Sequence, residues 1–400
     1  MTPFGRHLLQ HWWLDPDQTY LNHGTVGVTP RRVLQAQRDL CEQIERHPAR
    51  FVLRELMRLD SEPAPPGTAP ARLRVAAEHI AARLGARGED LVFVDNATSG
   101  VNAVLRSLSF GAGDEIVLLD HGYGAMTRVA GHIARLTGAR VVTATLPFPN
   151  PTPEGCVLAL QAALTPRSRL ALLDHICSET ALLLPLARMA EVCRVAGVAV
   201  LADGAHAPAA IALDIPALGV DWYAANLHKW AFAPRGCGIL WAAPPRQLGL
   251  HPAVISWGYD QRWDQEFDWT GTRDPSAWLT AIEGWRFIDE MLGGVDAMRA
   301  HNHALAWHAA TTLPALWGMA PAVPEPMVGC MATVALPLSL GSDARAASRL
   351  KDWLLFERGI EAPVAARGGQ LWARVSAQVY NDEDDVDRLG QAILQAADAG

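Results

Sequence analysis

The sequence has few cysteines, no excess of basic residues and no long hydrophobic run, and each absence excludes a class of protein. Its six cysteines lie far apart and form no CxxC pair, so we expect neither a zinc knuckle nor a disulfide framework. This cysteine usage favours a reducing cytoplasm. The formal net charge of −8 argues against a nucleic-acid-binding surface. No apolar run reaches the roughly 18 residues that a transmembrane helix needs, and the first residues do not resemble a secretory signal.

Common ligand-binding motifs are absent as well. No GxGxxG follows a predicted strand and no GxxxxGK[ST] occurs, so the sequence does not support a dinucleotide site or a P-loop. His301, His303 and His308 have no acid or cysteine at ligand spacing. We therefore interpret them as a solvated helix face and predict no metal site.

What the sequence does contain is an alternation of short apolar runs with helical segments. Residues 30–46 and 73–84 carry apolar side chains at helical spacing, and residues 61–70 predict a loop because they are rich in proline. Seven runs that are apolar on both faces predict strands: 91–94, 116–119, 140–144, 170–173, 198–202, 222–225 and 238–241. The alternation predicts an α/β fold with a mostly parallel sheet.

Several of the predicted strands end in polar residues. These ends are Asp95-Asn96, Asp120-His121, Asp174-His175, Asp203 and Asn226. In parallel α/β sheets, ligands bind at the carboxyl ends of the strands. We therefore expect one ligand site at one edge of the sheet.

Lys229 and Asp203 have the chemistry and spacing of a pyridoxal phosphate (PLP) site. Asp203 ends one predicted strand, and Lys229 follows the next one. Such a site needs a lysine to form a Schiff base with the cofactor and an acid to keep its pyridine nitrogen protonated. A lone lysine is more often a surface residue, but Asp203, His206 and His228 together favour the cofactor site.

Seven motifs occur in the order that is found in one enzyme family. They are YLNHGTVG (20–27), DNATSG (95–100), DHGYGA (120–125), DGAHAP (203–208), NLHKW (226–230), GTRD (271–274) and RVSAQVYN (374–381). This series resembles the class V aminotransferases, and most of all their isopenicillin N epimerase-like group. The resemblance implies PLP-dependent transferase fold type I, a seven-stranded sheet and a homodimer. We accordingly expect an N-terminal segment over the active site (1–29), a large PLP-binding domain (30–274) and a smaller α+β C-terminal domain (275–400).

The resemblance assigns a first group of residues to the cofactor. Asn96, Ala97 and Thr98 precede a predicted helix and are expected to hold the phosphate at its N-terminus; an ordinary helix cap is the alternative. Asp203 corresponds to the pyridine-nitrogen partner, and His206 is expected near the ring or its oxygen. The resemblance further places His228 at the phosphate and Ser178, in HICSET, at the ring oxygen.

Other residues are expected around the ring face and the substrate. In DHGYGA an aromatic side chain should cover the face opposite Lys229; Tyr123 is favoured, as a catalytic neighbour, and His121 is the alternative. Arg374 corresponds to the arginine that binds the substrate α-carboxylate, for which a planar guanidinium is well suited. Asn22 and His23 match the segment that folds over the site. Thr272, in GTRD, is expected to reach the phosphate of the partner subunit, so that a homodimer shares its active sites.

The cofactor motifs leave the reaction open, because different reactions start from the same cofactor complex. Lys229 is the natural base for the Cα proton of an amino acid. We expect an isopenicillin N epimerase-like enzyme that acts at Cα of an amino acid or a peptide-like amino acid. The close alternative is a carbon–sulfur lyase that acts on a cysteine or cysteine-sulfoxide conjugate, and an aminotransferase ranks below both.

Two further alternatives have less support. Cysteine desulfurases of this class need a nucleophilic cysteine shortly before the C-terminal arginine, but residues 359–374 contain none, and Cys330 lies in an apolar run that predicts a buried strand. A PLP-binding transcription regulator would need a DNA-binding module. The predicted large domain starts near residue 30, which leaves no room for one, and the chain is acidic.

Overall fold

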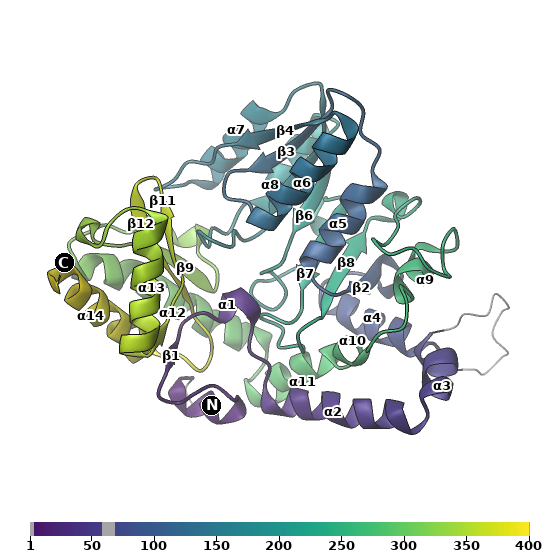
Figure 1. Ribbon diagram of the computed structural model, residues 1–400, viewed down its shortest axis with the longest axis horizontal. Helices are drawn as coiled ribbons and strands as arrows, with labels where there is room; N and C mark the ends of the chain where they lie inside the picture. The colour runs from purple at the N-terminus through teal and green to yellow at the C-terminus, as the bar shows by residue number, and fades with distance from the viewer. Residues whose placement is uncertain (1–3, 58–68, 400) are drawn as a thin grey trace.

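A seven-stranded, mostly parallel sheet forms the centre of the protein (Figure 1). The computed structural model describes residues 4–57 and 69–399, so most of the loop expected at 61–70 lies outside the described residues. The strands are β2 (Leu91–Val94), β3 (Glu115–Leu119), β4 (Arg140–Ala144), β5 (Ser168–Asp174), β6 (Ala199–Asp203), β7 (Trp222–Asn226) and β8 (Gly238–Ala242). Their order is β2-β8-β7-β6-β5-β3-β4, and β8 runs antiparallel to both of its neighbours. Each strand overlaps one of the seven predicted runs, and the predicted sheet is confirmed.

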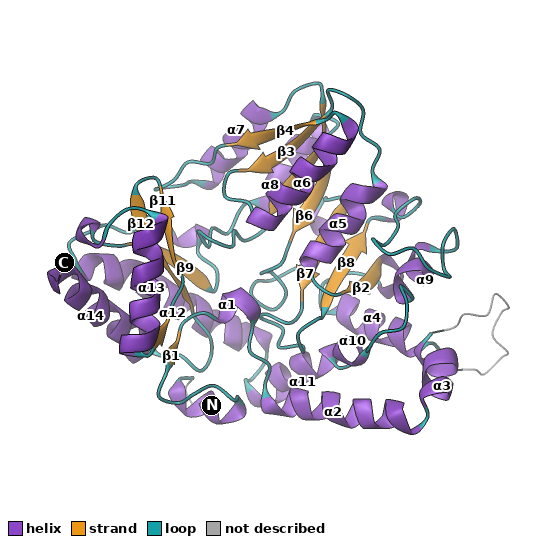
Figure 2. Ribbon diagram, viewed as in Figure 1, coloured by secondary structure: helices purple, strands orange, loops and turns teal. Residues whose placement is uncertain are grey.

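Helices cover both faces of this sheet, which explains why its strands are apolar on both sides (Figure 2). Side chains alternate between the faces: Val92 packs with α5 and α6, while Phe93 packs with α4. One face is covered by α5 (Ala97–Ser107), α6 (Gly124–Thr137) and α9 (Trp263–Asp268). The other is covered by α4 (Arg72–Ala82), α7 (Pro153–Ala163) and α8 (Leu186–Val195).

A smaller antiparallel sheet lies in the C-terminal part of the chain. Its strands are β9 (Met331–Ala335), β11 (Val364–Arg367) and β12 (Gln370–Ser376), in the order β11-β12-β9. The helices of this part are α12 (Val295–Leu316), α13 (Ala344–Arg358) and α14 (Glu383–Ala399). This arrangement agrees with the α+β composition that was expected there.

The segment that follows Asp274 forms two helices, α10 (Ser276–Leu279) and α11 (Ala281–Met291), which are separated at Thr280. The Thr280 hydroxyl donates a hydrogen bond to the Ser276 carbonyl at 2.6 Å, and such a bond to the preceding turn competes with the regular helix. Both helices pack against α2 (Arg31–Arg46) and α4. Contacts therefore group α10 and α11 with the large part of the chain, although they follow the expected domain boundary at 274.

The N-terminal segment connects the two parts. Its short strand β1 (Thr19–Tyr20) pairs in parallel with β10 (Ile360–Glu361), and the one-turn helix α1 (His23–Val26) follows. The remaining short helices are η1 (Arg6–His11), α3 (Pro48–Arg50), η2 (Phe51–Leu56), η3 (Gly88–Asp90), η4 (Pro216–Leu218), η5 (Pro244–Arg246), η6 (Glu325–Met327) and η7 (Leu338–Leu340). None of the helices within residues 4–57 and 69–399 is both long and apolar enough to cross a membrane.

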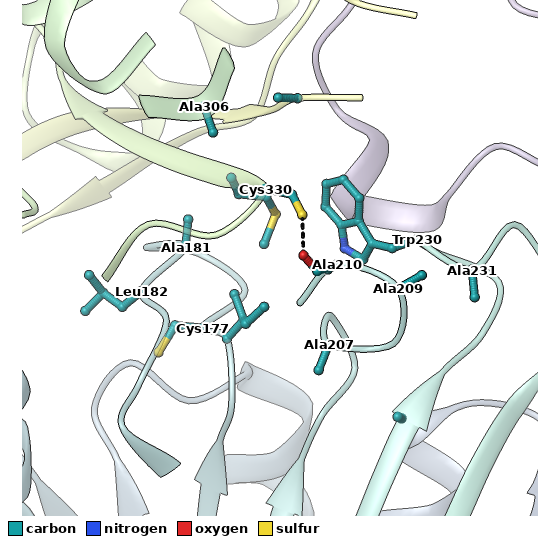
Figure 3. Close-up of a cluster of buried hydrophobic side chains, with 14 of the residues drawn as sticks. Cys177, Ala181, Leu182, Ala207, Ala209, Ala210, Trp230, Ala231, Ala306 and Cys330 are labelled. Carbon is teal, nitrogen blue, oxygen red and sulfur yellow. Dashed lines mark hydrogen bonds between the residues drawn. The ribbon is translucent and has the colours of Figure 1, made fainter. Parts of the chain in front are cut away.

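A buried cluster beyond the ends of β5, β6 and β7 joins the large and small parts (Figure 3). Cys330, just before β9, lies in this cluster with Trp230, and its thiol donates a hydrogen bond to the Ala210 carbonyl at 3.0 Å. Burial raises the pKa of this thiol to about 12. Cys330 is therefore a buried, protonated core residue, as the sequence predicts, and has none of the properties of a nucleophile on a mobile loop.

Candidate active site

A cavity of about 560 Å³ opens at the carboxyl ends of the central strands. Residues that follow or end β2, β5, β6 and β7 line it, as expected for a sheet of this type. The lining includes nine predicted site residues: Asn96, Ala97, Thr98, Tyr123, Ser178, Asp203, His206, His228 and Lys229. A larger hollow, of about 670 Å³, surrounds His251 and Trp263 and contains none of the predicted residues.

Lys229 presents a buried amine to this cavity. It follows β7, is 8% exposed, and its Nζ atom lies 3.0 Å from Nε2 of His206. Burial lowers the pKa of Lys229 to about 7, and the nearby charge of Asp203 opposes this shift without cancelling it. Burial also holds the pKa of His206 well below its ordinary value. A largely neutral amine at this site is a competent nucleophile and base.

Asp203 ends β6 and is also buried in the cavity wall. Burial raises the pKa of its carboxyl group, while the Ala205 N–H, which donates a hydrogen bond at 3.0 Å, and the Lys229 charge lower it. The next residue must be glycine, because a Cβ built on Gly204 would lie 2.1 Å from the Tyr223 ring. The Tyr223 ring on β7 thus packs directly against the backbone next to Asp203.

The N-terminus of α5 faces the same cavity and offers donors for an anion. Asn96 caps the helix by accepting a hydrogen bond from the Ser99 N–H at 3.0 Å. The Ala97 N–H donates to Oδ1 of Asn226 at 2.8 Å, which ties the helix to the end of β7. Thr98 lies between these two donors and lines the cavity, so the helix dipole and the Thr98 N–H favour a phosphate here.

The structure brings Tyr123 to the cavity and turns His121 away from it. Tyr123 lines the cavity, and its side chain is 47% exposed. His121 is 2% exposed, and its Nδ1 atom lies 2.8 Å from the Thr180 hydroxyl. Its ring packs edge-on against Phe148. Of the two aromatic candidates, the geometry favours Tyr123 for the ring face.

Arg374, on β12, is a buried cation without a carboxylate partner among the residues that the structure describes. Its guanidinium donates to Thr25 Oγ1 at 2.6 Å, to Asn22 Oδ1 at 3.1 Å and to the Ser178 carbonyl. Burial lowers its pKa to about 10, and its Nε atom is buried without a partner. Because Thr25 and Ser178 line the cavity, a carboxylate bound there would supply the missing negative charge.

His23 lies beneath Lys229 and is absent from the cavity lining. Its Nδ1 atom lies 2.8 Å from the Tyr380 hydroxyl, and its Nε2 atom lies 3.1 Å from the Lys229 carbonyl. Burial lowers its pKa to about 3, so the ring is neutral. Gly27 approaches the same loop so closely that an added Cβ would lie 1.9 Å from the His228 carbonyl oxygen.

Thr272 is exposed and lies outside the cavity lining of this chain. The adjacent Arg273 forms an ion pair with Asp95 and stacks on Trp278, with its guanidinium carbon 3.9 Å from the ring centroid. These contacts hold the GTRD turn beside the start of α5.

Sequence reasoning gave no role to four residues of this site: Thr25, Asp174, Asn226 and Glu361. The sequence does mark three of them as candidates, because Asp174 and Asn226 are polar residues at predicted strand ends and Thr25 lies inside the YLNHGTVG motif. Glu361 accepts a hydrogen bond from Asn22 Nδ2 at 2.7 Å. No local sequence pattern marks Glu361 as a site residue, because 339 residues separate it from Asn22.

The sheet order, the lysine after β7 and the acid that ends β6 define a PLP enzyme of fold type I. The donor set fits the cofactor: a neutral amine for its aldehyde, a buried acid, a helix N-terminus for its phosphate, and a buried His206 Nδ1 that lacks a partner within the described residues. Residues 28–389 match the sequence model of the family described as aminotransferase class V. The chain belongs to this family, and pyridoxal phosphate is its cofactor.

Sequence and structure comparisons with individual proteins show the degree of similarity. The chain is 34% identical to isopenicillin N epimerase of Streptomyces clavuligerus, over 95% of each protein. It is 30% identical to a probable chloroplastic L-cysteine desulfhydrase of Arabidopsis thaliana, over 95% of this chain and 83% of the relative. A cysteine desulfurase of Escherichia coli shares the fold, with a TM-score of 0.74, 21% identity and 98% coverage of each chain.

Proposed function

We propose that this enzyme removes and returns the Cα proton of an amino acid or a peptide-like amino acid, as an isopenicillin N epimerase-like enzyme. The observation that carries the proposal is the buried guanidinium of Arg374, without a carboxylate partner in the described residues, beside the cavity that holds the neutral amine of Lys229. A substrate whose α-carboxylate binds Arg374 would bring its Cα near the amine.

The chain's own residues divide the work of binding the cofactor. Asp203 would hold the proton of the pyridine nitrogen, with His206 and Ser178 near the ring oxygen. Asn96, Ala97, Thr98 and His228 would bind the phosphate at the start of α5. When bound, pyridoxal phosphate supplies an electron sink for the charge that is left at Cα.

Two groups would handle the Cα proton. Lys229 would take it as a base from one face, because its low pKa leaves the amine largely neutral near pH 8. The Tyr123 hydroxyl would return a proton from the other face. We place Asn22 beside the substrate carboxylate. Since both ring nitrogens of His23 contact protein atoms, His23 is better suited to position Lys229 than to bind substrate directly.

Incubation with candidate amino acids in deuterated water tests this proposal. Deuterium at Cα with inversion is expected for the wild-type enzyme. Tyr123→Phe should still exchange the proton but return it with retention, so inversion should fall at least about tenfold more than exchange. The absence of Cα exchange, of pyruvate and ammonia release, and of keto-acid exchange across the substrate set would refute the catalytic proposal.

The second candidate is a carbon–sulfur lyase that acts on cysteine or a cysteine-sulfoxide conjugate. The similarity to proteins named L-cysteine desulfhydrase supports it. The same base would remove the Cα proton, and a sulfur group would then leave from Cβ. Release of pyruvate and ammonia, without inversion of recovered substrate, would favour the lyase over the epimerase.

We also propose a homodimer in the cytoplasm in which Thr272 reaches the partner's phosphate site. The exposure of Thr272 supports this, as does the exposure of Val254, Ile255 and Trp257 in the preceding loop. The free cysteines of the described residues suit a reducing compartment. Mixing Lys229→Ala subunits with Thr272→Ala subunits should restore about one quarter of the sites, because one site of each mixed dimer is then intact. No restoration would contradict shared sites.

A further inference from the structure

Asp174 and Asp203 form a pair of carboxyl groups at the edge of the sheet. Asp174 ends β5, Asp203 ends β6, and the two are register partners on adjacent parallel strands. Adjacent strands lie only about 4.8 Å apart. Both residues are nearly fully buried, at 4% and 3% exposure, and both line the cavity that contains Lys229.

The pair cannot carry two negative charges. Among residues 4–57 and 69–399, neither carboxyl group has an arginine, lysine or histidine within ion-pair distance, whereas the structure contains many such pairs elsewhere. Two neighbouring carboxylates at a site of low polarity repel each other and lose solvation, so one of them retains a proton.

The surroundings place the negative charge on Asp203. Asp203 accepts a hydrogen bond from the Ala205 N–H at 3.0 Å, which lowers its pKa. Burial and the negative charge of Asp203 together raise the pKa of Asp174 well above its ordinary value, and hydrogen bonds from the backbone N–H groups of Tyr123 and of Asp174 itself lower it only in part. The Cys177 thiol, in the loop after β5, is also buried, which raises its pKa, so it remains neutral.

Asp174 also contacts the turn that carries Tyr123. A Cβ built on Gly122 would lie 3.3 Å from Asp174 Oδ2, so the carboxyl group packs directly on this turn. The turn begins α6, for which Tyr123 is the N-cap residue. Asp174 thus lies between the acid proposed for the ring nitrogen and the aromatic residue proposed for the ring face.

We propose that Asp174 is a positioning residue of the cofactor site: it keeps a proton beside Asp203, so that the single negative charge of the pair lies on Asp203, and it holds the Tyr123 turn. This inference rests on the proposed role of Asp203 at the ring nitrogen. A protonated Asp174 removes like-charge repulsion that would otherwise favour a neutral Asp203. Asp203 therefore remains anionic, as a partner of a protonated pyridine nitrogen must be.

Infrared spectroscopy of the holoenzyme at pH 8 tests where the proton lies. A protonated carboxylic acid has a carbonyl stretching band that carboxylates lack. Asp268, a buried acid whose pKa is raised to about 6 by burial, is ionised at this pH and does not interfere. We expect the band in the wild-type enzyme, a shift of the band after ¹³C-aspartate labelling, its loss in Asp174→Asn, and its retention in Asp203→Asn.

Cofactor titration separates a protonated acid from a merely structural one. Asp174→Asn keeps a neutral group that accepts the Tyr123 N–H, so pyridoxal phosphate affinity should stay within about threefold of wild type. Asp174→Ala leaves that N–H without its acceptor and should weaken affinity by about tenfold. Equal losses in the two variants would overturn the proposal, because they would show that a carboxylate is needed at position 174.

The infrared test of the proton on Asp174 does not depend on the proposed role of Asp203 at the ring nitrogen. No acid band in the wild-type enzyme, a band that persists in both single variants, or a band lost in Asp203→Asn but kept in Asp174→Asn would each refute a proton on Asp174. If Asp203→Asn instead binds pyridoxal phosphate as well as wild type, the proposed role of Asp203 fails. The band of the wild-type enzyme and its absence from Asp174→Asn would still place the proton.

Discussion

The low pKa of Lys229 predicts that one amine of this protein reacts with pyridoxal phosphate near neutral pH. Its pKa falls from 10.5 to about 7 on folding, chiefly because the ammonium loses solvation. At pH 8 about 90% of the amine is then neutral, compared with about 0.3% for a lysine of ordinary pKa, which is roughly a 300-fold gain in reactive amine. The rate of cofactor capture by the apoprotein should therefore rise with pH around 7 and level off above pH 8.

The composition makes this assay simple to interpret. The sequence has two lysines, Lys229 and the exposed Lys351 of α13. Reduction with borohydride followed by mass analysis of peptides should locate the cofactor at Lys229. Lys229→Ala should give no adduct and no visible absorbance band, and Lys351→Ala, the matched control, should behave as wild type. A capture rate that still climbs around pH 10, or an adduct that survives in Lys229→Ala, would refute the reasoning.

The low pKa of Lys229 also predicts how the stability of the apoprotein depends on pH. Between about pH 7 and 10.5 the unfolded chain binds a proton on this amine that the folded apoprotein does not bind. The free energy of unfolding of the apoprotein should therefore increase with pH across this window, by up to about 5 kcal/mol. In Lys229→Ala this contribution to the pH dependence should be absent, which denaturant titrations at several pH values would show.

Two further predictions concern the N-terminal segment. Gly27→Ala should destabilise the enzyme by about 3 kcal/mol or more in thermal unfolding, because the added Cβ would overlap the His228 carbonyl oxygen. Gly249 also has a positive φ but has open space around it, so the control Gly249→Ala should cost only about 1 kcal/mol. Equal losses of stability in the two variants would contradict this prediction. Glu361→Ala frees the Asn22 amide to rotate and should raise the substrate KM about tenfold with kcat and cofactor affinity unchanged, while Glu357→Ala on exposed α13 should leave KM unaltered. A fall in kcat alone would argue against this role.

Local patterns predicted the large sheet well, because most of its strands are buried on both faces, although the edge strand β4 is partly exposed. Each predicted run matches its strand to within about two residues, since an uninterrupted apolar run bounded by polar residues leaves little freedom in the assignment. The strand-end rule also placed Asp203 and Lys229 at one edge, and the structure brings both to one cavity. The roles assigned to individual site residues remain predictions.

Features that depend on contacts between distant segments were beyond sequence reasoning. The partners of Arg374 include Thr25, which lies 349 residues away, and no local period reports such a contact. The orientation of the DHGYGA turn decides between His121 and Tyr123, and that orientation depends on Thr180 and on the packing of Gly122 against Asp174. The break at Thr280 depends on one side-chain hydrogen bond, which the apolar pattern around it does not reveal.

The contacts of His23 have a consequence for the order of events during synthesis. This residue, near the beginning of the chain, contacts both Lys229 and Tyr380, and β1 just before it pairs with β10. The loop around Lys229 therefore cannot make all its native contacts during synthesis until residues up to about Tyr380 have left the ribosome. A nascent chain halted after β8 would contain Lys229, Asp203 and helix α5, yet it would lack Tyr380 and β10, which hold the N-terminal segment beside Lys229.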